Sequence, residues 1–116
     1  MGGGLITLPW PPTVNHYYTV ARGRKILSKR GREYKISSSV EMLRQKISRY
    51  QDKGPYCISI NAHPPDKRRR DLDNLLKPIL DALVDYGAIE DDSQVDDLRI
   101  QRFNPVKGGR IEVLIS

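Results

Sequence analysis

Cysteine is almost absent from this 116-residue sequence, which contains only Cys57. One thiol cannot close a disulfide within the chain, so the composition is typical of a reducing, cytoplasmic compartment. Long apolar runs are missing as well: no stretch approaches the roughly 20 residues of a membrane span, and none resembles the apolar part of a signal peptide. We therefore expect a cytoplasmic protein without a membrane partner.

The length predicts one domain over residues 1–116, with residues 1–4 as a flexible N-terminus. Apolar alternation predicts strands over residues 5–8, 56–63, 95–103 and 110–115. Residues 15–28 predict either a basic hairpin that turns at Gly23 or an irregular arm. With the two helices described next, the pattern indicates a single α/β (α+β) domain, in which a mixed β-sheet packs against two main helices.

Two segments have the periodicity of amphipathic helices. The first helix is expected over residues 33–51, ended by residues 52–55, and its predicted buried stripe is Ile36, Val40, Leu43, Ile47 and Tyr50. The second is expected over 73–86 with Gly87 as its C-terminal cap, and its predicted stripe is Leu75, Leu76, Ile79, Leu80 and Leu83. Pro78 near the first turn predicts that this second helix is kinked or starts late.

Charge is distributed unevenly. Seven of the twenty basic residues lie in the segment 22–35, whereas nine of the fourteen acidic residues lie in the segment 71–97, where Lys77 is the only cation. Such segregation predicts a surface that attracts a polyanion and a separate acidic place where a cation binds. The basic residues expected to contact DNA phosphates in the first segment are Arg24, Lys25, Lys29 and Arg30.

The most informative run covers residues 66–74, in which four consecutive cations directly precede two carboxylates. The cations are Lys67, Arg68, Arg69 and Arg70, and the carboxylates are Asp71 and Asp73. Cations attract phosphate, whereas a close pair of aspartates repels it unless a divalent metal lies between them. The run therefore predicts a metal-dependent nuclease.

Asp71 and Asp73 are two residues apart, so in an extended segment their side chains point the same way. Asp73 also suits a helix N-cap. Asp91 and Asp92 follow the second helix, and the chain path can bring them back near the sheet. Three or four converging carboxylate oxygens suit Mg²⁺.

Other residues of this segment have expected roles in the same chemistry. Lys77 is expected to orient the attacking water or to stabilise transition-state charge. Arg70 is expected to hold a phosphate, and Asn74 to position a water or a phosphate oxygen. Asp81 and Asp85, in contrast, are assigned to the solvated face of the second helix.

Two alternatives remain open from the residues alone. One is a basic DNA-binding module without catalysis, whose acids are caps and turns. The other is a metal-dependent hydrolase of small phosphates. The second fits less well, because Pro64 to Arg70 separate the aspartates from the preceding strand and because so many cations suit a polymer.

The chain resembles the RusA family of Holliday junction resolvases over almost its whole length. The segments that carry the resemblance are Leu8-Pro9-Trp10-Pro11-Pro12, Arg68-Arg69-Arg70-Asp71-Leu72-Asp73-Asn74-Leu75 with Lys77, Asp91-Asp92-Ser93-Gln94-Val95 and Lys107-Gly108-Gly109-Arg110. The resemblance implies that Asp71, Asp73 and Asp92 bind the metal and that Lys77 is essential. It also implies that Arg70 and Asn74 lie beside the site.

The resemblance further implies a homodimeric endonuclease of DNA recombination and repair. Such an enzyme resolves four-way DNA junctions by paired symmetric nicks and depends on Mg²⁺, with Mn²⁺ as a substitute. The two-fold symmetry of a junction also calls for two copies of a one-site domain. We expect the enzyme to act at the nucleoid of a bacterial or phage-infected cell, with no other protein partner.

Overall fold

The computed structural model describes residues 4–50 and 53–116. The predicted flexible N-terminus therefore lies outside the described residues except for Gly4, as do Gln51 and Asp52 at the predicted end of the first helix. Within the described ranges, no helix combines the length and apolar character needed to cross a bilayer.

A four-stranded mixed sheet forms one layer of the fold. Its strands, in spatial order, are β1 (Leu5–Leu8), β6 (Arg110–Ile115), β4 (Tyr56–His63) and β5 (Val95–Arg102). β4 and β5 are parallel, whereas β6 is antiparallel to both β1 and β4. All four predicted strands and the mixed character of the sheet are confirmed.

The parallel pair requires a crossover, which a helix supplies. A 3₁₀ turn, η1 (Leu72–Leu75), leads into helix α3 (Leu76–Tyr86). Pro78 is the third residue of α3, where a missing N–H costs no intrahelical hydrogen bond, so the late start that proline predicted is confirmed. Gly87 ends the helix at φ 93°, in the left-handed region that glycine adopts without a steric penalty.

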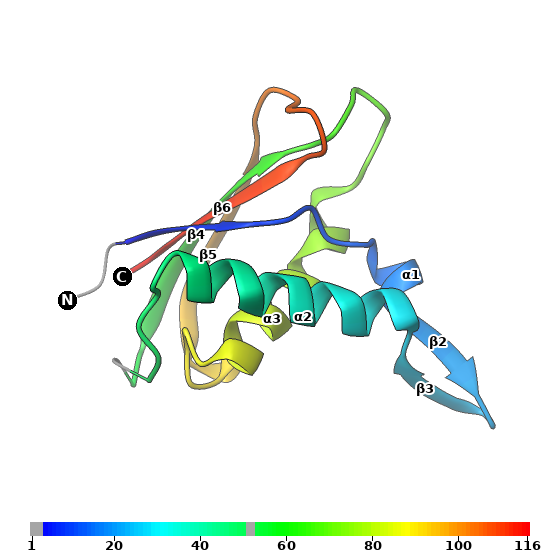
Figure 1. Cartoon of the computed structure of the whole chain (residues 1–116), viewed down its shortest axis with the longest axis horizontal. Coiled ribbons are helices and arrows are strands. Elements are labelled where there is room, and N and C mark those ends of the chain that lie inside the picture. Colours follow the sequence, from blue (N-terminus) through cyan, green and yellow to red (C-terminus); the bar gives the residue numbers. More distant parts are fainter. Residues whose placement is uncertain (1–3, 51–52) are drawn as a thin grey trace.

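Helices α2 (Lys29–Arg44) and α3 form the second layer, and with the sheet they enclose the core (Figure 1). β4 shows the alternation expected of a half-buried strand, since Tyr56, Ile58, Ile60 and Ala62 are buried between more exposed neighbours. Leu75, Ile79 and Leu83 of the predicted stripe are buried, and Leu76 and Leu80 pack against the core from partly buried positions. One face of the sheet therefore carries the helices, and the site described below is built on this helical side.

The first predicted helix differs from the structure in its bounds and in its buried face. α2 begins at Lys29, because the Ser28 side chain accepts a hydrogen bond from the Gly31 N–H, and it ends at Arg44. Its buried residues are Gly31, Tyr34, Ser38 and Met42. Four residues of the predicted stripe are exposed, so the prediction is wrong for them: Ile36, Val40, Leu43 and Tyr50 are 65%, 40%, 56% and 69% exposed. The fifth, Ile47, follows α2 and packs against the core from a partly buried position.

Gly31 explains this orientation of α2. A Cβ at this position would lie 2.5 Å from the Tyr17 carbonyl oxygen and 2.9 Å from Leu27 Cδ2, so only glycine allows the helix to approach so closely. Tyr17 ends the short helix α1 (Val14–Tyr17), which the sequence did not predict. The backbone contact at Gly31 therefore decides which face of α2 turns inward.

The basic hairpin is confirmed. β2 (Tyr18–Ala21) and β3 (Arg24–Leu27) pair antiparallel around a two-residue turn at Arg22 and Gly23, both with positive φ, as tight hairpins require. The hairpin projects from the body of the molecule beyond the start of α2 (Figure 1).

Replacing Gly31 with alanine tests the packing of α2. Helix propensity alone predicts stabilisation by Gly31→Ala. The contact with Tyr17 predicts the opposite, a loss of about 1–3 kcal/mol in unfolding free energy, because the new methyl group overlaps fixed backbone. Urea denaturation measures the difference. Gly4→Ala, where a Cβ meets no atom within 4 Å, is the control, and equal midpoints for the two variants would contradict the account.

Candidate active site

The two aspartates of the charged run flank the start of η1. Asp71 has an extended backbone (φ −88°, ψ 130°) and precedes the 3₁₀ turn, whereas Asp73 lies within it. Both side chains are exposed. The prediction that both lie in one extended segment is wrong, because Asp73 belongs to η1. The prediction that Asp73 caps a helix is wrong as well, because Leu75 is the N-cap of α3.

Lys77 lies in the first turn of α3 and forms an ion pair with Asp81 one turn later, with Lys77 Nζ 2.9 Å from Asp81 Oδ1. The other carboxylate oxygen, Oδ2, accepts a hydrogen bond from the Tyr17 hydroxyl at 2.8 Å. The Asp81 side chain is only 18% exposed. Its interpretation as part of a solvated helix face is therefore wrong: Asp81 holds the lysine.

The contacts with Asp81 raise the pKa values of Lys77 and Tyr17. The hydrogen bond to Asp81 raises the pKa of Lys77, with smaller contributions from Tyr18 and Asp92, and partial desolvation of the ammonium group opposes the rise. Burial raises the pKa of the Tyr17 phenol, and its hydrogen bond to Asp81 raises it further. Lys77 is therefore a cation at neutral pH, while Tyr17 keeps its proton to donate.

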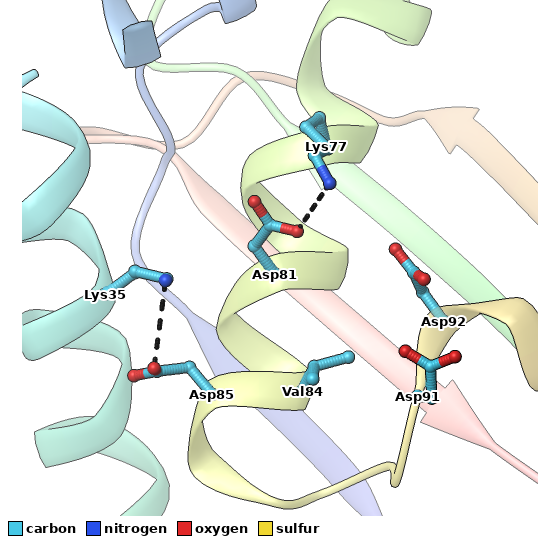
Figure 2. Close-up of a pocket in the computed structure, with 7 residues that line it drawn as sticks. All are labelled: Lys35, Lys77, Asp81, Val84, Asp85, Asp91 and Asp92. Carbon is cyan, nitrogen blue, oxygen red and sulfur yellow. Dashed lines mark ion pairs between the residues drawn. The ribbon is translucent and has the colours of Figure 1, made fainter. Parts of the chain in front are cut away.

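A hollow of about 310 Å³ opens beside this pair, and Figure 2 shows the residues that line it. Asp91 and Asp92 face α3 from the segment that follows the helix, where Asp92 begins a second 3₁₀ turn, η2 (Asp92–Gln94). Asp91 accepts a hydrogen bond from the Ser93 hydroxyl. The lining residues are Lys35, Lys77, Asp81, Val84, Asp85, Asp91 and Asp92.

Carboxylates outnumber cations in this hollow. Asp85 has Lys35 as its partner at 3.8 Å, and Asp81 has Lys77, which leaves Asp91 and Asp92 as additional negative charges. The second acidic pair returns to the sheet as predicted, because η2 leads directly into β5, and it lines the same hollow as Lys77. As far as residues 4–50 and 53–116 form the lining, Asp71 and Asp73 are not part of it.

The predicted metal ligands fit a hard divalent cation by their chemistry, since carboxylate oxygens are the donors that Mg²⁺ prefers. In the part of the chain that the structure describes, however, no three Asp, Glu, His or Cys side chains gather closely enough to hold a metal. Asp71, Asp73 and Asp92 therefore remain a predicted ligand set.

Arg70 organises the basic loop that precedes Asp71. Its Nη1 atom lies 2.8 Å from Asp66 Oδ1 and donates to the carbonyl oxygens of Asp66 and Arg68. Its guanidinium also lies over the Trp10 ring, 5.8 Å from the centroid. The contact of Arg70 with the Asp66 carboxylate lowers the pKa of Asp66, and the hydrogen bond that this carboxylate accepts from the Arg68 N–H lowers it further. These contacts tie the loop together.

The other predicted DNA contacts lie on the surface. Lys67, Arg68 and Arg69 are exposed, whereas Asn74 is half-buried in η1. Arg24, Lys25, Lys29 and Arg30 are exposed on β3 and the start of α2. The Lys25 ammonium lies 4.5 Å from the centroid of the Tyr18 ring, so the hairpin presents its cations on a structured arm.

Comparison with known proteins shows the family of the chain. The model of the family described as endodeoxyribonuclease RusA matches residues 9–116. The chain belongs to the RusA family. It is 42% identical over 111 residues, 96% of this chain and 92% of the relative, to the crossover junction endodeoxyribonucleases RusA of Shigella sonnei (strain Ss046) and Escherichia coli (strain K12). The protein of that name from Enterobacteria phage 82 matches to the same extent.

Sequence reasoning missed several residues that organise this RusA-family site. Asp81 could have been found, because it follows Lys77 by four residues on the same helix face. Asp66 precedes Arg70 by four residues as well, but in a loop this spacing predicts no contact. No local pattern predicts that Tyr17 contacts Asp81, since only the fold brings the two residues together across 64 positions.

Exchanging the Asp81 carboxylate for an amide tests its hold on Lys77. In Asp81→Asn, we expect the pKa of Lys77 to fall, because the largest cause of its elevation is removed. NMR titration of the lysine side-chain carbons measures this pKa. Asp85→Asn is the matched control on the same helix, since Asp85 pairs with Lys35 instead; an equal fall in both variants, or none in Asp81→Asn, would contradict the assignment.

Proposed function

We propose that this protein is a Mg²⁺-dependent endonuclease that resolves four-way DNA junctions, with Mn²⁺ as a substitute metal. The observation that carries the proposal is its membership of the RusA family, whose curated relatives are named crossover junction endodeoxyribonucleases and match 96% of the chain. The cationic Lys77 opposite Asp92, on the helix that follows Asp71 and Asp73, supports it.

Asp71, Asp73 and Asp92 are proposed to hold the Mg²⁺, which would polarise a phosphoryl oxygen and acidify an attacking water. The residues of the chain contribute a fixed cation. Lys77 keeps its proton beside Asp81 and is directed into the hollow, where it would stabilise negative charge that develops on the phosphate. Asp81 and Tyr17 act as positioning residues, because they hold Lys77 from outside the reacting atoms.

Lys67, Arg68 and Arg69 are proposed to bind phosphates next to the cleaved bond, with Arg70 holding the loop and Asn74 directed to the site from η1. The hairpin and the start of α2 would contact a junction arm through Arg24, Lys25, Lys29 and Arg30. Such phosphate contacts position DNA without reading its sequence, and they weaken with salt.

A homodimer follows from the symmetry of the substrate. Paired nicks on opposing strands require two sites related by a two-fold axis, and one copy of this domain offers one site. Sedimentation of the free protein and of its junction complex would measure the number of copies.

One alternative function is retained, a non-catalytic module that binds junction DNA. The observation that favours it is the lack of a gathered carboxylate cluster within residues 4–50 and 53–116. The two functions differ in metal dependence: binding alone needs no divalent cation, whereas cleavage needs both the cation and its ligands.

Incubating a labelled four-way junction with the protein, in Mg²⁺ and in EDTA, tests the proposed function. We expect symmetric nicks in Mg²⁺ that a linear duplex of the same sequence does not receive. Asp71→Asn and Lys77→Ala should each slow cleavage by about a hundredfold or more, because the first removes a proposed metal ligand and the second removes the cation proposed to stabilise charge on the phosphate.

Asp96→Asn is the matched control, since Asp96 is exposed on β5 and does not line the hollow. It should cleave as fast as the unmodified protein. Tight junction binding without cleavage in Mg²⁺ or Mn²⁺ would refute the enzyme and support the non-catalytic module.

A further inference from the structure

A second hollow lies between the basic loop and the end of β5, apart from the hollow beside Lys77. It encloses about 380 Å³, which is the size of a small-molecule pocket. Cations dominate its lining: Lys67, Arg68, Arg69 and Arg70 come from the loop, Arg102 comes from β5, and Asp66 is the one acid. The ligand that this charge favours is an anion.

One wall of this hollow is aromatic. Phe103, the single phenylalanine of the sequence, is 42% exposed directly after β5. Its position is fixed, because its N–H donates to the Ala62 carbonyl oxygen at 2.8 Å and its ring lies 5.4 Å from the ring of His63. His63 in turn lies between the Asn104 carbonyl oxygen and the Glu112 carboxylate. An apolar ring is thus held at the surface, ready to contact a flat partner.

Hydrogen bonds connect this hollow to the proposed catalytic residues. Arg102 donates to the carbonyl oxygen of Arg70, the residue directly before Asp71. Arg70 uses its own guanidinium within the loop, on Asp66, and the exposed cations Lys67, Arg68 and Arg69 remain around the rim. A group bound here would therefore contact residues that directly precede Asp71 in the sequence.

We propose that this hollow binds an unstacked nucleotide of the junction strand, with its base stacked on Phe103 and its phosphate held by the cations of the rim. The inference rests on the proposed function and adds a reason why the protein would prefer a four-way junction to a linear duplex. Aromatic side chains beside cations are the chemistry by which proteins bind single-stranded nucleic acid, because every base offers a π-face. At the crossover of a junction the strands pass from one duplex arm to another, which interrupts base stacking. Displacing a base there therefore costs less unstacking free energy than displacing a base inside a duplex.

Binding measurements without a divalent metal test this inference independently of cleavage. The probes are a four-way junction with 2-aminopurine beside the crossover, a ten-nucleotide oligothymidine and a linear duplex. We expect Phe103→Leu, which keeps an apolar side chain against His63, to weaken binding of the junction and of oligothymidine by about five- to tenfold. It should abolish quenching of 2-aminopurine and leave duplex binding unchanged, and Phe103→Tyr should restore all values.

Leu98→Ala is the matched control, because Leu98 is a similarly exposed apolar residue, at 39%, on the strand that leads to Phe103, but does not line this hollow. It should change none of the three affinities. If Phe103→Leu leaves all three affinities unchanged, or weakens all three equally, the nucleotide pocket is refuted, even where the unmodified protein cleaves junctions. If the protein quenches 2-aminopurine through Phe103 but never cleaves, the pocket stands and the proposed nuclease function fails.

Discussion

The arrangement of the site depends on the two contacts of the Asp81 carboxylate. One oxygen holds the ammonium of Lys77 and the other accepts a hydrogen bond from Tyr17, so a single side chain joins the first turn of α3 to α1. Tyr17 is itself fixed, because its carbonyl oxygen lies against Gly31 at the start of α2. Three helices are therefore related through two contacts, and Lys77 is held at the hollow that Asp92 also lines.

The basic loop is organised by the same principle, in which an acid positions a cation. Asp66 and the loop carbonyl groups hold Arg70, and Arg102 holds the Arg70 carbonyl oxygen. Of the four consecutive cations, one is thus structural and three are exposed. The loop is therefore held in place by Arg70, while the three exposed cations supply positive charge beside Asp71.

Much of the fold could be predicted from the sequence, because strands and caps leave local signals. The alternation at Tyr56, Ile58 and Ile60 gave β4, and Gly87 gave the end of α3. The face of α2 could not be predicted, because it depends on the contact of Gly31 with a residue of α1. At the site, Asp71, Asp73 and Lys77 can be recognised in the sequence because they lie close together in one charged segment. Burial of a neighbouring residue depends on the fold and leaves no local signal. For this reason Asp81 was predicted to be a solvated acid.

The central claim is that a divalent metal brings Asp71, Asp73 and Asp92 together on a bound junction. Paramagnetic broadening by Mn²⁺ measures this directly, by NMR of Lys77→Ala in complex with a four-way junction, since this variant keeps all three aspartates. The account predicts that amide signals of residues 71–74 and 91–93 broaden together at low Mn²⁺ and recover when Mg²⁺ is added in excess. Broadening of only one of the two segments, or of neither, would contradict a shared metal site.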